Sequence, residues 1–374
     1  MKYKAVNINF PNMSAIGIGH SVIDSSDKRK NISDSERIKL LRCSLDCGMN
    51  LIDTAENYGN GKSEEIIGKT LVKSERDKIY ISTKVSPENL NFNGVIKSCH
   101  DSLKRLQTDY IDIYQIHWPN PDVELKETFD ALNKLKDSGF IKHIGVSNFS
   151  NYLYRQAKEY ANIEVVQLEH NSISQISGAD FLSYNEDNIL VIGYSPLYMP
   201  PDYRDKFGIL EIMEEKYKAT KQQILLNWIS NTNNNLIPVA KSNNATNIYS
   251  NSKSLDFDID ESDIKILNLI LRTRHEYIPM KYIKITLYGR EDKEFYQTIQ
   301  EAVENRFGLY PSPQSLASWM SKYNGHLVKP IKVLRESTDQ EKYRYELYEG
   351  RVRFWANVIY NNGNMDKTIS TIIL

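Results

Sequence analysis

Short apolar segments alternate with longer segments of helical periodicity through most of this chain of 374 residues. Apolar residues three and four positions apart predict amphipathic helices, whereas a short apolar run between turn residues is typical of a buried strand. The helical pattern covers residues 35–47, 64–72, 95–106, 125–137, 221–230 and 264–270. Eight strands are predicted at residues 15–18, 50–52, 79–82, 111–116, 141–146, 165–168, 190–194 and 236–239.

This alternation of strands and helices predicts an α/β fold with a parallel sheet. Eight such units close most simply into a (β/α)8 TIM barrel, which commonly uses about 250 residues. An open doubly wound sheet is the alternative, and its first turn should carry three glycines followed by a helix. The segment Gly17-Ile18-Gly19-His20 lacks the third glycine and the helix. We therefore expect a barrel over residues 1–272.

The helical pattern ends near residue 270, and residues 272–276 are predicted to be a linker. About a hundred residues follow, with aromatic residues and an alternating pattern of their own. An alternating strand near residues 345–349 runs into a glycine and then into a helical segment. Residues 276–374 are therefore predicted to form a second, smaller α+β domain.

The overall charge narrows the choice of partners. The formal net charge is -1, and residues 276–374 hold 14 Lys and Arg against 12 Asp and Glu, so no basic surface for nucleic acid is expected. No apolar run reaches the length of about 18 residues that a membrane span needs, and residues 1–10 lack a signal-peptide core. We expect a cytoplasmic protein without a membrane partner. The oligomeric state is left open.

The three cysteines have no metal-like spacing, and an odd number does not suit a disulfide framework. Cys43 and Cys47 lie four positions apart on a predicted helix, where helix packing is the simplest explanation for both. We expect reduced thiols at Cys43, Cys47 and Cys99, and no bound metal.

Polar residues follow three successive predicted strands. Asp53 follows the second strand, Lys84 the third and His117 the fourth, and Tyr58 lies five residues beyond Asp53. Active sites of such barrels gather at the carboxyl ends of the strands. Each residue alone has an ordinary explanation as a turn, surface or packing residue. The four in strand order predict one cluster that delivers a proton.

A free tyrosine has a pKa near about 10, and a cation within about 4 to 6 Å favours the phenolate. We therefore expect Lys84, held by Asp53, to lower the pKa of Tyr58. His117 would orient a carbonyl group by a hydrogen bond or help to relay the proton.

On these motifs the sequence resembles the aldo-keto reductase superfamily over residues 14–270. The resemblance implies that Asp53, Tyr58, Lys84 and His117 form the family's catalytic tetrad. It also implies a nicotinamide cofactor that lies extended across the barrel mouth. The matching stretches are Leu51-Ile52-Asp53-Thr54-Ala55-Glu56-Asn57-Tyr58-Gly59, Ile81-Ser82-Thr83-Lys84, Ser102-Leu103-Lys104-Arg105-Leu106, Asp109-Tyr110-Ile111-Asp112, His117-Trp118-Pro119, Gly145-Val146-Ser147-Asn148-Phe149 and Tyr194-Ser195-Pro196-Leu197.

The same resemblance implies the cofactor contacts at the later strand ends. Ser147, Asn148 and Gln167 would hydrogen-bond the nicotinamide carboxamide, and Tyr194 would stack on its ring. Ser195 and Leu197 would belong to the same cofactor site.

Beyond the last strand, the resemblance assigns Lys241 and Ser242 to the adenosine 2'-phosphate and Asn251 to the adenine. The sequence departs from the family here, because Asn247 stands where an arginine is usual and Ser250 where an acidic residue is usual. A single lysine still attracts a phosphate, although the bidentate grip of an arginine is lost. We therefore expect NADP(H) in preference to NAD(H).

The substrate is expected to be a small carbonyl compound. His20, Trp118, Tyr198 and Tyr203 are either walls of an aromatic pocket, suited to a sugar or small aldehyde, or packing residues at its rim. The predicted function is NAD(P)H-dependent reduction of an aldehyde or ketone to an alcohol. The alternative is an NADP(H)-binding redox sensor that regulates a partner through its C-terminal domain.

Residues 276–374 resemble the ParB/sulfiredoxin-like fold around Gly350, Arg351 and Arg353. That family binds a nucleotide phosphate with a Gly-Glu-x-Arg type of motif at a helix N-terminus. Arg351 stands where the acidic residue is usual, which puts catalysis by this domain in doubt. A degenerate phosphate-binding or interaction module, a structural appendage and a nucleotide-dependent transferase all stay open.

Overall fold

The structure is a computed structural model that describes residues 1–374 except 23–31, 200–207, 272–273, 286–294, 323–329 and 336–342. The chain divides into two compact units. Unit 1 contains Met1–Pro119 and Leu125–Leu271, and unit 2 contains Asn120–Glu124 and Arg272–Leu374. Each unit has its own sheet and its own buried core.

Unit 1 is a closed barrel of eight parallel strands in the order β10-β3-β4-β5-β6-β7-β8-β9. This confirms the predicted (β/α)8 barrel, and each of the eight predicted strands corresponds to one barrel strand. The first strand is displaced toward the C-terminus from its predicted position. The strands are β3 (Gly17–Gly19), β4 (Leu51–Asp53), β5 (Tyr80–Val85), β6 (Ile111–Ile116), β7 (Ile141–Ser147), β8 (Ile163–Glu169), β9 (Leu190–Tyr194) and β10 (Leu236–Ala240).

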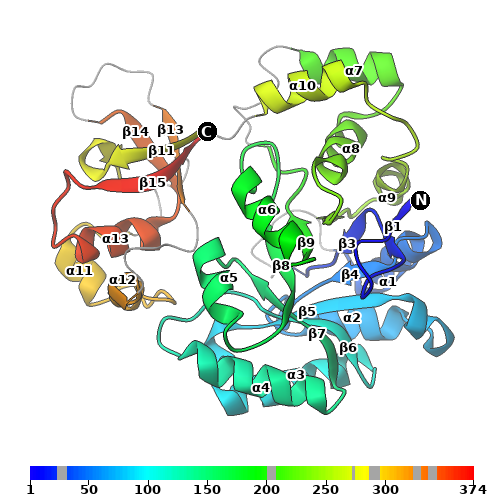
Figure 1. The fold of residues 1–374 in the computed structure, drawn as a ribbon, viewed down its shortest axis with the longest axis horizontal. Helices are drawn as coiled ribbons and strands as arrows, with labels where there is room; N and C mark the ends of the chain where they lie inside the picture. The colour runs from blue at the N-terminus through cyan, green and yellow to red at the C-terminus, as the bar shows by residue number, and fades with distance from the viewer. Residues whose placement is uncertain (23–31, 200–207, 272–273, 286–294, 323–329, 336–342) are drawn as a thin grey trace. The chain divides into compact units, whose positions relative to one another are not determined.

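Helices lie outside the strands of the barrel (Figure 1). Helix α3 shows why: its residues Val95, Cys99, Leu103 and Leu106 recur at helical spacing and are all buried. The helices of unit 1 are α1 (Asp34–Asp46), α2 (Lys62–Thr70), α3 (Phe92–Leu106), α4 (Leu125–Asp137), α5 (Asn151–Ala157), α6 (Gly178–Glu186), α7 (Ile209–Tyr217), α8 (Lys221–Thr232), α9 (Ala245–Ser252) and α10 (Glu261–Ile270).

Side-chain caps mark the starts of several of these helices. The Thr220 hydroxyl accepts a hydrogen bond from the backbone of Gln223, whose side chain accepts one from the Thr220 backbone. This reciprocal arrangement satisfies two backbone donors that helix α8 leaves unpaired. Asn91 caps α3 with its side-chain oxygen, which accepts a hydrogen bond from the backbone of Gly94.

The N-terminal segment covers the amino ends of the barrel strands. The short strands β1 (Tyr3–Lys4) and β2 (Met13–Ser14), which were not predicted, pair with each other. Phe10 is fully buried, and its ring lies against those of Tyr80 and His143. Burial of such a side chain stabilises the fold by about 1.5–3 kcal/mol. The barrel interior near the amino ends of the strands is thus an apolar core. It is formed by Val6, Phe10, Met13, Leu51, Ile113, Val165, Leu190, Ile192, Ile237 and Val239.

Unit 2 is an α+β structure, as predicted. Its five-stranded mixed sheet has the order β11-β15-β13-β14-β12. The predicted linker at residues 272–276 is wrong in part, because residues 274–276 pair with β15 as the start of β11. The elements are β11 (Arg274–Pro279), β12 (Ile283–Lys284), α11 (Ile299–Val303), α12 (Pro313–Lys322), β13 (Ile331–Arg335), β14 (Tyr345–Glu349), α13 (Arg351–Tyr360) and β15 (Thr368–Ile373).

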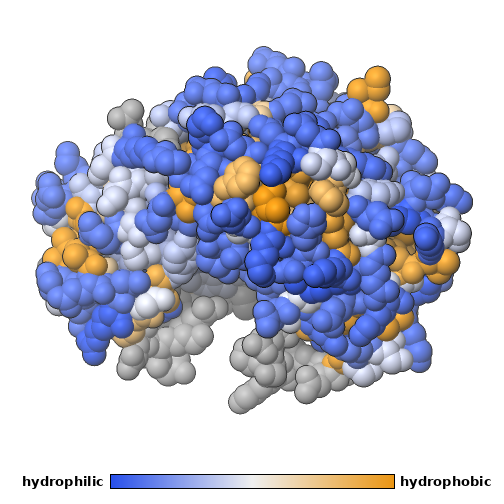
Figure 2. All heavy atoms as spheres, turned by 90° about the horizontal axis from the view of Figure 1, so that it is seen from below, coloured by the Kyte–Doolittle hydropathy of each residue, from blue (hydrophilic) through white to orange (hydrophobic). Residues whose placement is uncertain are grey.

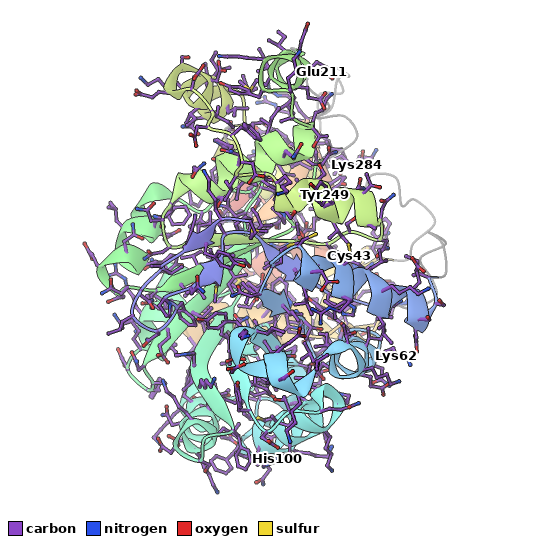
Figure 3. The ribbon with its side chains drawn as sticks, turned by 90° about the vertical axis from the view of Figure 1, so that its right-hand side faces the viewer. Cys43, Lys62, His100, Glu211, Tyr249 and Lys284 are labelled. Carbon is purple, nitrogen blue, oxygen red and sulfur yellow. The ribbon has the colours of Figure 1, made fainter. Side chains whose placement is uncertain are left out.

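Most of the face in Figure 2 is hydrophilic, with smaller hydrophobic patches between polar side chains. Within the described ranges, no helix combines the length and the apolar character that a membrane crossing requires. Cys43, like Lys62 and Tyr249, lies on the outer helices (Figure 3), and none of the three cysteines forms a disulfide.

Candidate active site

A cavity of about 660 Å³ opens at the carboxyl ends of the barrel strands. It is the place where the sequence predicted the site residues to meet. Eleven of the thirteen predicted catalytic and cofactor-binding residues of the barrel line it: Asp53, Tyr58, Lys84, His117, Ser147, Asn148, Gln167, Tyr194, Ser195, Leu197 and Lys241.

Asp53 and Lys84 form a buried ion pair at the base of this cavity. The Lys84 ammonium donates to both carboxylate oxygens of Asp53 at 2.9 Å and to the Thr54 carbonyl at 2.6 Å. Ser82 and Gln167 each donate one further hydrogen bond to Asp53, both at 3.0 Å. A carboxylate that accepts this many hydrogen bonds is held in one orientation, and so is its lysine.

Tyr58 lies beside this pair. Its ring centroid is 5.6 Å from the Lys84 ammonium nitrogen and 5.5 Å from the His117 ring, which it meets edge-on. Lys84 lowers the pKa of Tyr58, as predicted, but the net shift is upward. Burial raises the pKa of the phenol and outweighs the attraction of Lys84, while the nearby Asp53 raises it further. Tyr58 is therefore protonated at neutral pH.

His117 is a neutral imidazole in this environment. Burial, followed by repulsion from Lys84, lowers the pKa of His117 to about 3. Its Nδ1 atom is buried and has no hydrogen-bond partner among the described residues. A neutral ring carries one N–H, so His117 can donate a hydrogen bond without carrying a charge.

Asn148 joins the ends of three strands. Its side-chain nitrogen donates to the His117 carbonyl at 3.0 Å and to the Ser147 hydroxyl at 3.1 Å, and its side-chain oxygen accepts from the Tyr194 hydroxyl at 2.7 Å. Asn148 has a φ of 62°, a left-handed conformation that asparagine tolerates better than most residues. These contacts place Ser147, Asn148 and Tyr194 side by side at the cavity wall.

A second, smaller cavity adjoins the first and holds the two remaining predicted cofactor residues, Ser242 and Asn251. Lys241, Ser242 and Asn251 line it, and the two cavities share Gly19, His20, Ser21, Ala240 and Lys241. The Lys241 ammonium donates to the Ser21 carbonyl at 2.7 Å. The two adjoining cavities thus bring a buried donor set and cations to the same end of the barrel.

Arg37 is a residue of this second cavity that the sequence analysis missed. It comes from α1, lines the cavity together with Lys241, and is half-buried. Its guanidinium makes no hydrogen bond or ion pair with the part of the chain that the structure describes. Burial, followed by repulsion from Lys241 and then from Arg37, lowers the pKa of His20 to about 4. This cavity therefore has two cationic side chains, whereas the sequence predicted one.

Three of the four predicted substrate walls line the larger cavity: His20, Trp118 and Tyr198. Tyr203 lies outside the described residues. His20 is anchored through Nδ1, which lies 2.7 Å from the Ser63 hydroxyl. Among the residues that the structure describes, no cluster of three or more His, Cys, Asp or Glu side chains suits a metal ion.

The comparison with known proteins decides the family. A family model described as "Aldo/keto reductase family" matches residues 15–272. The chain belongs to the aldo/keto reductase family. This membership confirms the resemblance inferred for the first part of the chain and the predicted class of NAD(P)H-dependent oxidoreductases.

Two curated aldo/keto reductases illustrate the sequence similarity. Aldo-keto reductase YhdN of Bacillus subtilis (strain 168) is 35% identical over 197 residues, which are 50% of this chain and 59% of that protein. Methylglyoxal reductase DkgB of Escherichia coli O157:H7 is 30% identical over 247 residues, 63% of this chain and 88% of that protein.

Two solved structures illustrate the similarity of fold. The thermostable aldo-keto reductase Tm1743, in complex with the inhibitor epalrestat, has a TM-score of 0.66 and 30% identity, and the match covers 72% of this chain and 100% of that one. An aldo-keto reductase from Klebsiella pneumoniae in complex with NADPH has a TM-score of 0.64 and 26% identity, with 72% and 96% covered.

The predicted phosphate residues of unit 2 lie at the start of α13. Gly350 has a φ of 107° and precedes the helix, and Arg351 and Arg353 lie in its first turn. Arg353 donates to the Pro330 carbonyl and pairs with Glu349 at 3.1 Å. Glu349 thus partly neutralises the cation that the sequence analysis assigned to a phosphate.

Proposed function

We propose that this aldo/keto reductase reduces a small aldehyde or ketone to an alcohol with NADP(H), and that Tyr58 is the proton donor. The observation that carries the proposal is the buried Lys84–Asp53 pair beside a protonated Tyr58 and a neutral His117 in one cavity. Proton donor, cation and neutral hydrogen-bond donor are the three groups that carbonyl reduction needs near the substrate oxygen.

A reduced nicotinamide held at this site would supply the hydride to the carbonyl carbon. Tyr58 transfers its phenol proton to the carbonyl oxygen, so that the C=O bond becomes an alcohol and Tyr58 is left as a phenolate. Lys84 stabilises this phenolate electrostatically until a proton from water replaces the lost one. His117 orients the carbonyl by donating a hydrogen bond from its neutral ring. The raised pKa of Tyr58 keeps the donor protonated before each turnover.

We infer the cofactor contacts from the residues that line the two adjoining cavities. Ser147, Asn148 and Gln167 would hold the carboxamide, and Tyr194, Ser195 and Leu197 would border the nicotinamide. At the other end, Arg37 and Lys241 would bind the 2'-phosphate, with Ser242 and Asn251 beside the adenosine. A Klebsiella pneumoniae relative is solved with NADPH, and two cations favour a phosphate dianion more than one does. The cofactor is NADP(H).

The substrate is a small carbonyl compound. Several curated relatives are methylglyoxal reductases, which favours a compact aldehyde. Trp118 and Tyr198 at the cavity wall also suit a sugar aldehyde through ring stacking.

The test is a steady-state screen of methylglyoxal and sugar aldehydes with NADPH. We expect turnover above about 0.1 per second for at least one of them. Tyr58→Phe should lower kcat by about 100-fold or more with NADPH affinity nearly unchanged. Tight NADPH binding without turnover of any aldehyde would instead support the redox-sensing alternative.

For unit 2 we propose a ParB/sulfiredoxin-like fold over residues 276–374 that binds a phosphate-bearing ligand at the start of α13. The backbone N–H groups of the first helical turn and the Arg351 guanidinium would contact the phosphate. Calorimetric titration of the full chain with ATP tests this idea, with Arg351→Ala as the variant. Equal ATP binding by both proteins, or none by either, would refute it.

A further inference from the structure

Gln115 is a buried amide inside the barrel that the mechanism above does not use. It lies on β6, is 0% exposed, and is not among the residues that line the cavity. Its side-chain nitrogen donates to the Ser82 hydroxyl and to the side-chain oxygen of Gln167, both at 2.8 Å. Ser82 and Gln167 in turn donate to the two oxygens of Asp53. The four side chains form a closed ring of hydrogen bonds.

The hydrogen atoms in this ring determine the orientation of each amide. Ser82 has a single hydroxyl hydrogen, which it donates to Asp53, so its oxygen must accept from Gln115. Gln167 donates its nitrogen to Asp53, so the atom it turns toward Gln115 is its oxygen. If the Gln115 amide turned over, its oxygen would face the Gln167 oxygen and the Ser82 oxygen, and neither could donate a hydrogen bond to it. The ring therefore has one consistent arrangement.

Two further observations show that the fold accommodates Gln115 at a cost. The side-chain oxygen of Gln115 is buried without a hydrogen-bond partner among the described residues, which an apolar side chain would avoid. On the neighbouring strand β7, Gly145 pairs with Gln115, and a Cβ at Gly145 would lie 2.7 Å from the Gln115 Cγ. The glycine leaves the room that the Gln115 side chain occupies.

We propose that Gln115 is a positioning residue that acts on the cofactor through Gln167. By engaging the Gln167 oxygen inside the barrel, Gln115 prevents the Gln167 amide from turning over, and it keeps the nitrogen directed to Asp53 and the cavity. The nicotinamide carboxamide then meets one fixed arrangement of donor and acceptor. This inference rests on the proposed function, in which Gln167 contacts the carboxamide.

A double-mutant cycle tests the proposal. NADPH dissociation constants are measured by fluorescence titration for the full chain and for Gln115→Leu, Gln167→Leu and the double variant. We expect each single variant to weaken NADPH binding by about 5- to 10-fold, and the double variant to be no weaker than Gln167→Leu, because coupled residues are not additive. Gly145→Ala, which forces Gln115 aside, should weaken binding to a similar extent.

Tyr114→Phe is the matched control. Tyr114 neighbours Gln115 on β6 but points to the opposite face, and its buried hydroxyl has no hydrogen-bond partner among the described residues. Its loss should leave NADPH affinity unchanged. The Gly145→Ala result decides the question should Gln115→Leu not fold.

The outcomes separate the two proposals. If Gln167→Leu weakens NADPH binding but Gln115→Leu does not, or if the two effects multiply in the double variant, the positioning role is overturned and the proposed function stands. If Gln167→Leu leaves NADPH binding unchanged, the assignment of Gln167 to the cofactor is wrong, and the positioning role falls with it.

Discussion

Each unit buries a lysine against a carboxylate, and the two pairs differ in how far water reaches the acid. In unit 1 the side chains of Lys84 and Asp53 are 2% and 7% exposed. In unit 2 the side chain of Lys332 is 3% exposed, but its partner Glu349 is 39% exposed. The same pair of functional groups thus lies in two different dielectric environments.

Burial of both partners, and not the ion pair as such, gives a lysine electrostatic influence over its neighbours. Burial is the main cause of the lowered pKa of His117 and of the raised pKa of Tyr58, and the charge of Lys84 adds to the first shift and opposes the second. Because Glu349 is partly exposed, water screens its ion pair with Lys332. Asp53 is buried, so its ion pair with Lys84 is screened much less. A catalytic role suits the first pair, and a structural role suits the second.

Removal of the buried lysine of unit 1 should have the largest effect. Lys84→Met leaves Asp53 buried without its counter-charge and leaves the Tyr58 phenolate unstabilised. We expect kcat to fall by about 100- to 1000-fold and the free energy of unfolding to fall by about 3–5 kcal/mol. Stopped-flow kinetics and urea denaturation measure the two quantities. Retention of normal turnover by a folded Lys84→Met protein would refute the proposed mechanism.

The cations of the smaller cavity should affect cofactor choice and not catalysis. Arg37→Ala and Lys241→Ala each remove one charge from the expected 2'-phosphate site, so NADPH affinity should fall by about 10-fold, or about 1.4 kcal/mol. NADH affinity should stay the same, since NADH lacks the phosphate. Arg42→Ala is the control, because Arg42 on the same helix pairs with Asp46 and Glu75. Equal losses for NADPH and NADH would contradict the assignment.

Acid should destabilise unit 1 through its buried histidines. Burial lowers the pKa of His170 to about 4, whereas an unfolded histidine titrates near 6.5. The unfolded state binds more protons between these values, so stability is complete above pH 6.5 and falls as the pH decreases toward 4. We expect a loss of about 1–2 kcal/mol between pH 7 and pH 5. His170→Gln should show a shallower slope in urea titrations at several pH values.

Removal of the lysine from the partly hydrated ion pair of unit 2 should have the smallest effect on stability. Lys332→Met leaves Glu349 with water and with Arg353 as partners. The free energy of unfolding of unit 2 should therefore change by less than about 1 kcal/mol, measured by the same urea titration with tryptophan fluorescence. A loss as large as that of Lys84→Met would show that exposure of the acid does not explain the difference between the pairs.

Much of the fold could be predicted from local patterns in the sequence. The eight barrel strands were predicted because each is a short apolar run between turn residues, a signal contained within a few neighbouring positions. The linker at residues 272–276 was misjudged because polar residues of β11 lie on a sheet edge, where alternation of buried and exposed positions is weak. The pairing of β1 with β2 was missed because each strand has only two residues.

The features of the site could likewise be predicted only in part from the sequence. Strand order and motif spacing were enough to predict that Asp53, Tyr58, Lys84 and His117 meet at one mouth, because parallel strands end on the same side. The direction of the Tyr58 pKa, the presence of Arg37 and the ring around Gln115 depend on burial and on contacts between distant segments. Gln115 and Gln167 are 52 positions apart, and no local pattern encodes the register that brings their amides together.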